Sequence, residues 1–525
     1  MPFLKRRHVI AAGLGALVLL AGVARAQFAD AAANVTYDTG SGLVFTVNGT
    51  NGNISSLQHN GVELAASGQA AGQFQSGWSS AAVSSRTIGT SVLVTVANSD
   101  LGVTMYYFAR RNDNTIYIAT NITKALNPGE ARFISRLKSS LLTTSPVAAR
   151  TAGFGTTVEG SDVFADANGR TASKFYNSQR TLVQQPFGAS GNGHGAYIIP
   201  GSHEMSSGGP FFRDIEVNDT GSAVNITHYM FSGHQQTEPL RLGLHGPYAL
   251  AVTDGAPPAG RSLDFLSGAI PGLLPDAQRG GVSGTASGAT SATVGLAGPT
   301  GQYWGAVKSG QFVIGHIRPG TYTATLYSGE LAVSSKTVTV AGGATTTVAL
   351  SGSAPASGTL LQLGVFDGTP AGFRNADKIE TMHPSDSRMA SWQPGTVSSA
   401  ASWPMASFKA VNSPLALAFP LASVPANGVR LRIAITGGFA GGRPAVSIGG
   451  FTSPASASPA SENLNSRGVT RGTWRGVNRT YSFAIPAGAL KTGTNTLSIS
   501  VISGSSGDGF LSPNFVYDAI ALDPA

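Results

Sequence analysis

Short runs of β-branched and aromatic residues recur along the chain, and turn-forming residues separate them. Leu43 to Val47 alternates loosely between apolar and polar positions, and Val103 to Phe108 and Thr115 to Thr120 continue the pattern. Asn-Gly pairs, which favour tight hairpin turns, stand at residues 48–49, 51–52 and 60–61. No helical periodicity lies between these runs, so the pattern predicts an all-β chain of antiparallel sheets packed as sandwiches.

Changes in composition divide the chain into three expected domains. Residues 27–266 form a region much larger than an immunoglobulin-type sandwich of roughly 100 residues, which favours a larger double sheet. Residues 267–352 carry short Val/Thr strands typical of a small sandwich, and a Ser/Ala/Pro-rich linker follows. Residues 358–525 contain short strands broken by Gly/Ser loops, which suggests a jelly roll. In that last region Trp392 and Trp403 are either stacking platforms for sugar rings or core residues.

The N-terminus has the features of a secretory signal peptide. Lys5, Arg6 and Arg7 precede an apolar run from Val9 to Val23, which is shorter than the ~20 residues that span a bilayer. A small-x-small sequence at residues 24–26 then predicts cleavage after residue 26 and a secreted or periplasmic protein. A retained membrane anchor is the alternative.

Charge and cysteine content narrow the classes of partner. Loss of residues 1–26 would lower the formal net charge from +8 to +4, because four basic residues lie there. No Lys/Arg-rich run remains, so a nucleic-acid partner is not expected, whereas a mild positive balance suits a polyanionic substrate. The chain has no cysteine, which excludes disulfides and cysteine-ligated metals.

A basic set of side chains between residues 132 and 234 suits β-elimination from a uronic acid. Arg132 and Arg136 are four positions apart, Lys174 stands two residues before Tyr176, and His234 follows Ser-Gly. In such a reaction a cation neutralises the carboxylate, which makes the neighbouring C5 proton acidic. A base removes that proton, and an acid protonates the oxygen that leaves C4.

Paired carboxylates leave a second chemistry open. A glycosidase needs two carboxyl groups that face each other at a fixed separation, which the sequence does not reveal. Glu159 or Glu238, with a histidine, are the candidates for a glycosidase or mutarotase. Glu159 and Asp162 are more plausibly residues that brace Lys174 or a turn. A secreted polysaccharide-binding protein without turnover is the third hypothesis.

Five segments together resemble one known family. They read SKFYNSQR, SSGGPFFRDI, YMFSGHQQTE, LGLHGPY and FDGTPAGFRNADKIETMHPSDSRM, and they resemble the rhamnogalacturonan lyases of polysaccharide lyase family 4 in the family's order. The resemblance implies a galactose-mutarotase-like β-supersandwich, a fibronectin-III-like or prealbumin-like sandwich and a carbohydrate-binding jelly roll. It also implies a secreted endolyase that cleaves the rhamnose-galacturonate bond of rhamnogalacturonan I, a pectin, and leaves a 4,5-unsaturated galacturonate.

The resemblance also assigns roles to individual residues. It makes Lys174 and His234 the catalytic pair, with the lysine as base and the histidine as acid, although the reverse order stays open. It makes Arg132 and Arg136 the uronate-binding residues, and it implicates Tyr229 in substrate contact, with Tyr176 as a further contact.

The sequence departs from the family pattern at two positions. Thr227 stands where a second aromatic contact is expected, which affects subsite preference. Phe212 replaces a histidine in the GPFHRDI segment, so that position is not needed as an acid.

No cofactor is expected, although oxygen-rich loops such as Ser505 to Asp508 could hold a structural calcium. The expected partner is rhamnogalacturonan I, with no nucleic acid and no membrane after signal cleavage, and the chain is expected to be a monomer.

Overall fold

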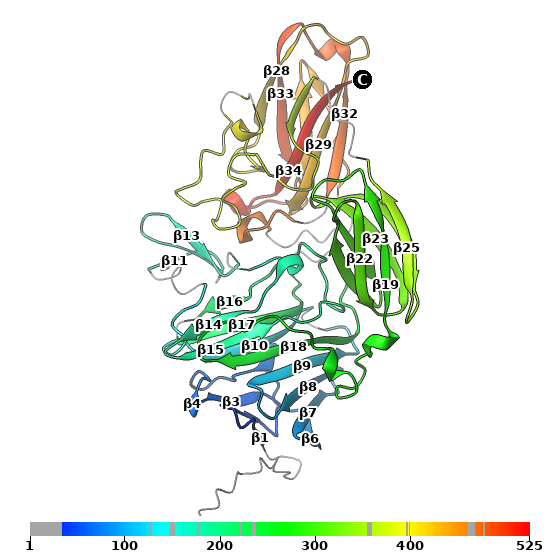
Figure 1. Ribbon diagram of the computed structural model, residues 1–525. Helices are drawn as coiled ribbons and strands as arrows, with labels where there is room; N and C mark the ends of the chain where they lie inside the picture. The colour runs from blue at the N-terminus through cyan, green and yellow to red at the C-terminus, as the bar shows by residue number, and fades with distance from the viewer. Residues whose placement is uncertain are drawn as a thin grey trace, which may run out of the picture.

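The computed structural model describes residues 34–126, 129–146, 153–160, 162–175, 178–220, 222–233, 238–353, 360–394, 397, 399–458, 468–475 and 478–525. Within these ranges every regular element is a β-strand or a short 3-10 helix, which confirms the all-β prediction. Figure 1 shows an N-terminal unit at the bottom, a middle unit at the side and a C-terminal unit on top. The 3-10 helices are η1 Thr181–Val183, η2 Asp264–Leu266, η3 Asp276–Gln278, η4 Ala400–Ser402, η5 Val469–Arg471, η6 Ala487–Ala489 and η7 Gly509–Leu511.

The predicted signal peptide lies outside the described residues. Among the residues that the structure does describe, no helix is both long enough and apolar enough to pass through a bilayer.

The N-terminal unit is a double layer of antiparallel sheets around one large core. Its widest sheet has seven strands in the order β14 Phe187–Gly191, β15 His194–Ile199, β18 Gly243–Thr253, β9 Thr115–Ile122, β8 Val103–Arg110, β7 Ser91–Asn98 and β6 Ala82–Ile88. Two four-stranded sheets pack with it, one of β1 Val35–Asp38, β2 Leu43–Val47, β3 Ile54–His59 and β4 Val62–Glu63, the other of β16 Val217–Asp219, β17 Ala223–Phe231, β10 Ala131–Lys138 and β5 Gln73–Phe74. Phe45, Tyr107, Phe133 and Tyr248 are buried between the sheets.

The Asn60-Gly61 turn has the geometry that its sequence predicts. Asn60 and Gly61 both have positive φ and join β3 to β4 through a two-residue turn. Asn51-Gly52 lies in a longer connection between β2 and β3, where Gly52 packs so closely on Val96 that a Cβ would overlap it. A glycine is therefore required there by packing as well as by φ.

The middle unit is a small two-sheet sandwich that contacts the N-terminal unit around the buried carboxylate of Glu204. Its sheets are β22 Gln311–Ile317, β19 Gly280–Ser287 and β25 Thr345–Ser351, and β21 Gly301–Ala306, β20 Thr293–Gly298, β23 Gly320–Ser328 and β24 Leu331–Val340. Glu204 of the N-terminal unit pairs with Arg279 and with Arg318, whose Nε lies 2.9 Å from Oε1, and accepts a hydrogen bond from Tyr303.

The C-terminal unit is the predicted two-sheet jelly roll. One sheet has β26 Leu361–Gly364, β34 Asn514–Pro524, β29 Val429–Phe439 and β32 Arg479–Ile485, with β27 Ala406–Phe408 also paired to β34; the other has β28 Leu415–Leu421, β33 Gly493–Ile502, β30 Arg443–Ile448 and β31 Phe451–Thr452. β34 is therefore an inner strand. Trp403 is 0% exposed and Trp392 is 8% exposed, so both are core residues and the interpretation as sugar platforms is wrong.

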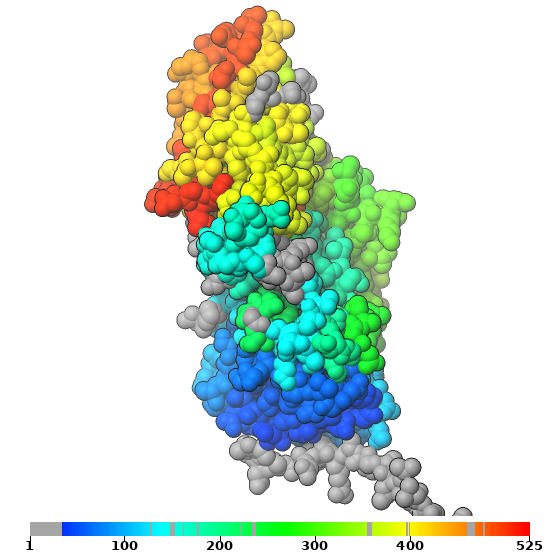
Figure 2. All heavy atoms as spheres, turned by 90° about the vertical axis from the view of Figure 1, so that its left-hand side faces the viewer, coloured from blue at the N-terminus to red at the C-terminus, as the bar shows by residue number. Residues whose placement is uncertain are grey.

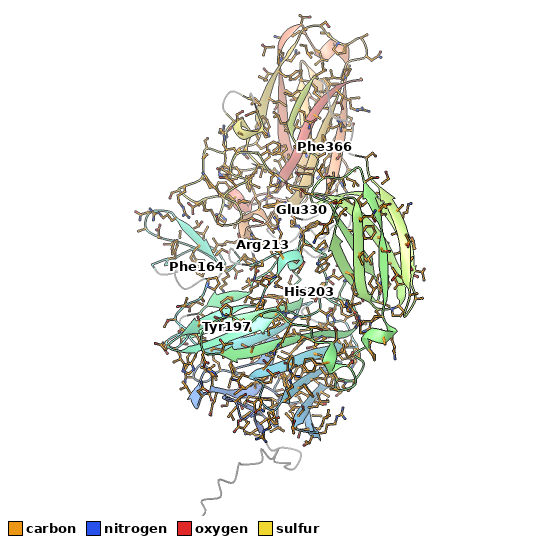
Figure 3. All side chains as sticks on the ribbon, in the orientation of Figure 1. Phe164, Tyr197, His203, Arg213, Glu330 and Phe366 are labelled. Carbon is orange, nitrogen blue, oxygen red and sulfur yellow. The ribbon has the colours of Figure 1, made fainter. Side chains whose placement is uncertain are left out.

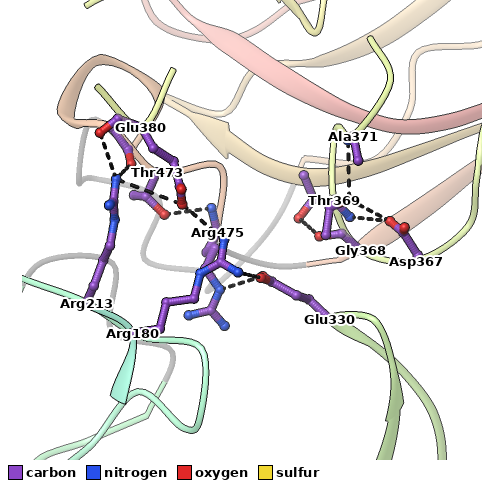
Figure 4. A network of polar contacts seen from close by, with 12 residues as sticks. Arg180, Arg213, Glu330, Asp367, Gly368, Thr369, Ala371, Glu380, Thr473 and Arg475 are labelled. Atoms are coloured by element: carbon purple, nitrogen blue, oxygen red, sulfur yellow. Dashed lines mark hydrogen bonds and ion pairs between the residues drawn. The ribbon is translucent and has the colours of Figure 1, made fainter. Parts of the chain in front are cut away.

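Glu330 joins all three units (Figure 4). This middle-unit carboxylate lies 3.0 Å from Nη1 of Arg180 in the N-terminal unit and accepts a hydrogen bond of 2.8 Å from Nε of Arg475 in the C-terminal unit. Arg180 also pairs with Glu380 at 3.0 Å and lies over the ring of Trp474 at 5.0 Å. Because Glu330 is only 7% exposed, its charge depends on these two cations.

Replacement of Glu330 by Gln should uncouple the units. Arg180 and Arg475 would then face each other without the shared carboxylate, a change that typically costs about 3–5 kcal/mol. Differential scanning calorimetry should show a separate transition at lower temperature for the C-terminal unit in Glu330→Gln. Asp100→Asn, on the exposed turn between β7 and β8, is the control. A single unshifted transition in Glu330→Gln would contradict the prediction.

Candidate active site

The outer face of the β10–β17 pair carries both predicted arginines and the predicted tyrosine. The two strands run antiparallel with Arg132 opposite Tyr229 and Arg136 opposite Asn225. Side chains alternate along a strand, so Arg132 and Arg136 share the outer face while Phe133 between them enters the core. The structure therefore brings three of the expected substrate-binding residues to one surface.

Arg132 is held in place by two neighbours. Its Nη1 donates to the Tyr229 hydroxyl at 3.1 Å, and its Nε lies 2.8 Å from the Glu130 carboxylate. Burial alone would lower the pKa of Arg132, but Tyr229 and Glu130 outweigh it and the pKa is raised. Burial, reinforced by the charge of Asp214, raises the pKa of Tyr229. Both groups therefore keep their protons in the functional pH range.

Arg136 differs from Arg132 because its guanidinium makes no ion pair or hydrogen bond with any residue that the structure describes. Burial and the nearby charge of Arg132 lower the pKa of Arg136. A half-buried guanidinium of this kind can engage a carboxylate with two parallel hydrogen bonds.

Lys174 follows a small sheet that projects from the N-terminal unit. This sheet contains β11 Thr156–Glu159, β12 Val163–Ala165 and β13 Thr171–Ser173. The Lys174 amide donates to the Asp162 carbonyl at 3.2 Å, and its ammonium lies 3.5 Å from Asp162 Oδ1. The lysine side chain is 19% exposed. Asp162 thus braces the lysine, as its position in the sequence suggested.

Phe175 links the lysine to the arginine face. Its ring and Ile215 are buried together, and Tyr229 packs against them. The residue next to Lys174 therefore lies beside Tyr229, although Tyr229 and Lys174 belong to different parts of the N-terminal unit. Figure 3 shows the small sheet through Phe164, and Arg213 between the N-terminal and C-terminal units.

His234 and Tyr176 lie outside the described residues, so their predicted roles stay predictions. Their described neighbours approach the same site. Ser232 and Gly233 directly follow β17, the strand that carries Tyr229, and Gly233 has a φ of +73°, where a Cβ would lie 2.9 Å from the Gly129 carbonyl oxygen.

Glu216 is a further titratable group beneath this face. Its carbonyl accepts a hydrogen bond of 2.8 Å from Thr227, which places the two residues opposite each other on the edge of the β16–β17 pair. Gln184 donates to its Oε1 at 2.6 Å. Burial raises the pKa of Glu216 to about 7, so this carboxyl is partly protonated at neutral pH.

Family models and known relatives match along almost the whole chain. The model "Rhamnogalacturonan lyase B, N-terminal" matches residues 27–268, and "Polysaccharide lyase family 4, domain II" and "domain III" match residues 278–348 and 359–522. The alignment with rhamnogalacturonate lyase A of Emericella nidulans spans 525 positions at 44% identity and covers 97% of this chain and 98% of the relative. Rhamnogalacturonate lyase A of Aspergillus aculeatus is 43% identical over 493 residues, 91% of this chain and 92% of the relative.

The chain belongs to polysaccharide lyase family 4. The predicted resemblance to this family is thereby confirmed.

In this family 4 chain, the carboxylates that a glycosidase would use are engaged by other protein groups. Glu159 has a fully buried side chain and accepts a hydrogen bond of 2.9 Å from Arg471. Glu238 pairs with Arg241 and accepts a hydrogen bond from the Gly208 amide at 2.6 Å. Each carboxylate is thus held by an arginine, so the geometry disfavours the glycosidase hypothesis.

Three other histidines of the N-terminal unit are structural. His203, His228 and His245 are buried, and burial lowers the pKa of each, to about 4 for His203 and His245. They are therefore neutral rings near neutral pH. His228 stacks on Tyr248 with ring centroids 4.1 Å apart, and His203 stacks on Trp304.

No group of three or more His, Asp or Glu side chains among the described residues is arranged to hold a metal ion. In the loop suggested for calcium, the Ser505 carbonyl accepts a hydrogen bond from the Lys409 ammonium at 3.3 Å. The structural calcium stays a prediction.

Arg471 and Glu216 were not given roles from the sequence. Arg471 lies 297 positions after Lys174 in a different unit, and no motif or periodicity links the two. Glu216 was one of several carboxylates, and only its burial distinguishes it.

Replacement of Glu216 by Gln should change how stability depends on pH. The unfolded carboxyl ionises near its ordinary value of 4.5 and the folded one near 7. The protonated carboxyl therefore contributes stability that is fully present below about pH 4.5. As the pH rises to about 7, the free energy of unfolding falls by about 3 kcal/mol. Glu216→Gln lacks this pH-dependent loss. Urea unfolding should therefore show that the free energy of unfolding of the variant, relative to that of wild type, increases between pH 5 and pH 8. A constant difference would contradict the assignment.

Proposed function

We propose that this chain cleaves the bond between rhamnose and galacturonate in rhamnogalacturonan I by β-elimination. The relatives named rhamnogalacturonate lyase A support the substrate and the reaction class. The structural observation that carries the proposal is the meeting of Lys174, through Phe175, with a face that bears the unpaired guanidinium of Arg136. A polyanionic polymer requires such a cation, and an elimination requires such a base.

The reaction that we assign proceeds from proton removal to bond cleavage. Arg136, with Arg132 beside it, binds the galacturonate carboxylate and stabilises the negative charge that develops when C5 loses its proton. The side-chain nitrogen of Lys174 takes that proton, and the C5–H electron pair forms the C4=C5 double bond. The C4–O bond breaks, and His234 supplies a proton to the departing oxygen. The products are a 4,5-unsaturated galacturonate and a new rhamnose end.

The remaining features extend the same proposal to the whole protein. Tyr229 and Tyr176 contact the sugar next to the cleaved bond, and the jelly roll binds a neighbouring stretch of the polymer. The protein acts outside the cytoplasm as a monomer after removal of residues 1–26, with no cofactor in the chemical step. A polysaccharide-binding protein without turnover would bind the same polymer but form no unsaturated product.

Replacement of Lys174 by Ala should remove most of the activity. Loss of a general base typically lowers kcat by about 10²- to 10⁴-fold. The measurement is the ultraviolet absorbance of the new double bond conjugated with the carboxylate, with rhamnogalacturonan I as substrate and mass analysis of the products. Lys124→Ala, at an exposed lysine that donates to the Ser99 carbonyl, is the matched control. Normal turnover in Lys174→Ala would refute the assigned base.

Replacement of Arg136 by Met should weaken both binding and chemistry, because the carboxylate loses its unpaired cation. We expect kcat/KM to fall about 10²-fold or more, as for loss of one oxyanion-stabilising group. Lys138→Met is the matched control on the same strand face, since its ammonium already donates to the Glu63 carbonyl at 2.8 Å. An equal loss for both variants would indicate a general charge effect, and no loss for Arg136→Met would contradict its role.

A further inference from the structure

We propose that the C-terminal jelly roll supplies a positioning residue to the active site, Arg471, which fixes the Asp162 carboxylate that faces Lys174. The inference rests on the proposed function, because it gives Arg471 a role that acts through the assigned base. It also gives the C-terminal unit a part in the chemical step, in addition to any binding of polymer.

Arg471 makes three contacts with the small sheet that carries Lys174. Its Nε donates to Glu159 Oε1 at 2.9 Å, its Nη2 lies 3.1 Å from Asp162 Oδ2, and its guanidinium carbon lies 5.1 Å from the centre of the Phe175 ring. The arginine side chain is 17% exposed. One side chain from another unit thus contacts the residue after Lys174 and the carboxylates of Glu159 and Asp162.

Asp162 is shared between two cations. Oδ1 faces the Lys174 ammonium at 3.5 Å, while Oδ2 faces Arg471 at 3.1 Å. The carboxylate cannot turn further toward Lys174 without losing Arg471, so the arginine sets the direction from which Asp162 holds the lysine. The Asp162 carboxylate also shares its negative charge between the two cations, so Lys174 is not its sole counter-ion.

Glu159 is a second carboxylate that holds Arg471 in position. Its side chain is fully buried, and its second oxygen lies 3.8 Å from Nε2 of His383. Burial lowers the pKa of His383 to about 4, so this ring is neutral near neutral pH and supplies no positive charge. Arg471 pairs with the first oxygen of Glu159 at 2.9 Å, and this contact directs the arginine side chain toward the small sheet.

The C-terminal unit is anchored to the N-terminal unit by further contacts near this one. Asp386 accepts hydrogen bonds from the Thr171 amide at 2.6 Å and from the Thr171 hydroxyl at 2.7 Å. Arg213 of the N-terminal unit donates to the carbonyl of Gly472, the residue after Arg471. Figure 2 shows the cyan small sheet directly beneath the yellow part of the C-terminal unit. The position of Arg471 relative to Lys174 is therefore determined by several independent contacts.

The test compares kcat and KM of full-length variants on rhamnogalacturonan I. Arg471→Met keeps a long side chain over Phe175 but removes the charge, and we expect kcat to fall about 10- to 100-fold, as for a misplaced catalytic group. KM should stay within about twofold, because the substrate carboxylate is held elsewhere. Arg471→Lys should recover part of kcat, since an ammonium can pair with one carboxylate but not with both.

Two further measurements separate positioning from docking. Thr171→Val removes one anchor between the units but leaves Asp162 and Arg471 intact, so its kcat should stay within about twofold of wild type. In a double-mutant cycle, Arg471→Met should lower kcat little further once Asp162→Asn is present, because both act through one contact.

Several outcomes would overturn the proposal. They are a normal kcat in Arg471→Met, a rise in KM without a fall in kcat, an equal loss in Thr171→Val, or additive losses in the cycle. A wild-type chain that forms no unsaturated product would refute the proposed function and this inference together. An active wild type with a normal Arg471→Met variant would refute this inference alone.

Discussion

The register between β10 and β17 is the constraint on which the site depends. Side chains on a strand alternate between its two faces, so a slip of one residue would send Arg132 and Arg136 into the core and Phe133 out of it. Phe133 is fully buried and its ring lies 5.8 Å from that of Tyr248 on the facing sheet. The apolar packing of the N-terminal core therefore fixes which residues can meet a substrate on the outer face.

A few buried carboxylates hold the three units together. Charged residues make up only 11% of the chain, and there is no disulfide to restrain the units. Glu204, Glu330 and Glu159 nevertheless each receive at least one arginine from another unit. Buried ion pairs of this kind add little net stability but are costly to break, so they specify one relative arrangement of the units.

Much of the fold could be predicted from the sequence, because strand alternation and turn residues are local patterns. The alternation of Leu43 to Val47 matches the buried and half-buried positions of β2, and Asn60-Gly61 forms the expected turn. The register of β10 against β17 brings Arg132 next to Tyr229, two residues that the family motifs had each assigned to substrate contact. The tryptophans of the C-terminal unit show the limit of such reasoning, because an aromatic side chain fills a core as readily as it binds a sugar.

The electrostatic surroundings of the site could not be predicted from the sequence in the same way. The contact between Arg471 and Asp162 joins positions 309 residues apart in the sequence. It depends on how two units dock, and docking leaves no periodic pattern in either unit. Likewise, the raised pKa of Glu216 results from the loop that buries it, which only the assembled structure shows.

The inner position of β34 has a consequence for the timing of synthesis. The jelly-roll sheet cannot close until residues 514–524 are available to pair with β26, β27 and β29. At about 5–20 residues per second, a ribosome needs roughly 20–70 s to proceed from Lys174 to the end of β34. During that interval the nascent polypeptide contains β10 with Arg132 and Arg136 but lacks the complete C-terminal unit that contacts the segment around Lys174. The active site is therefore incomplete while the polypeptide is attached to the ribosome.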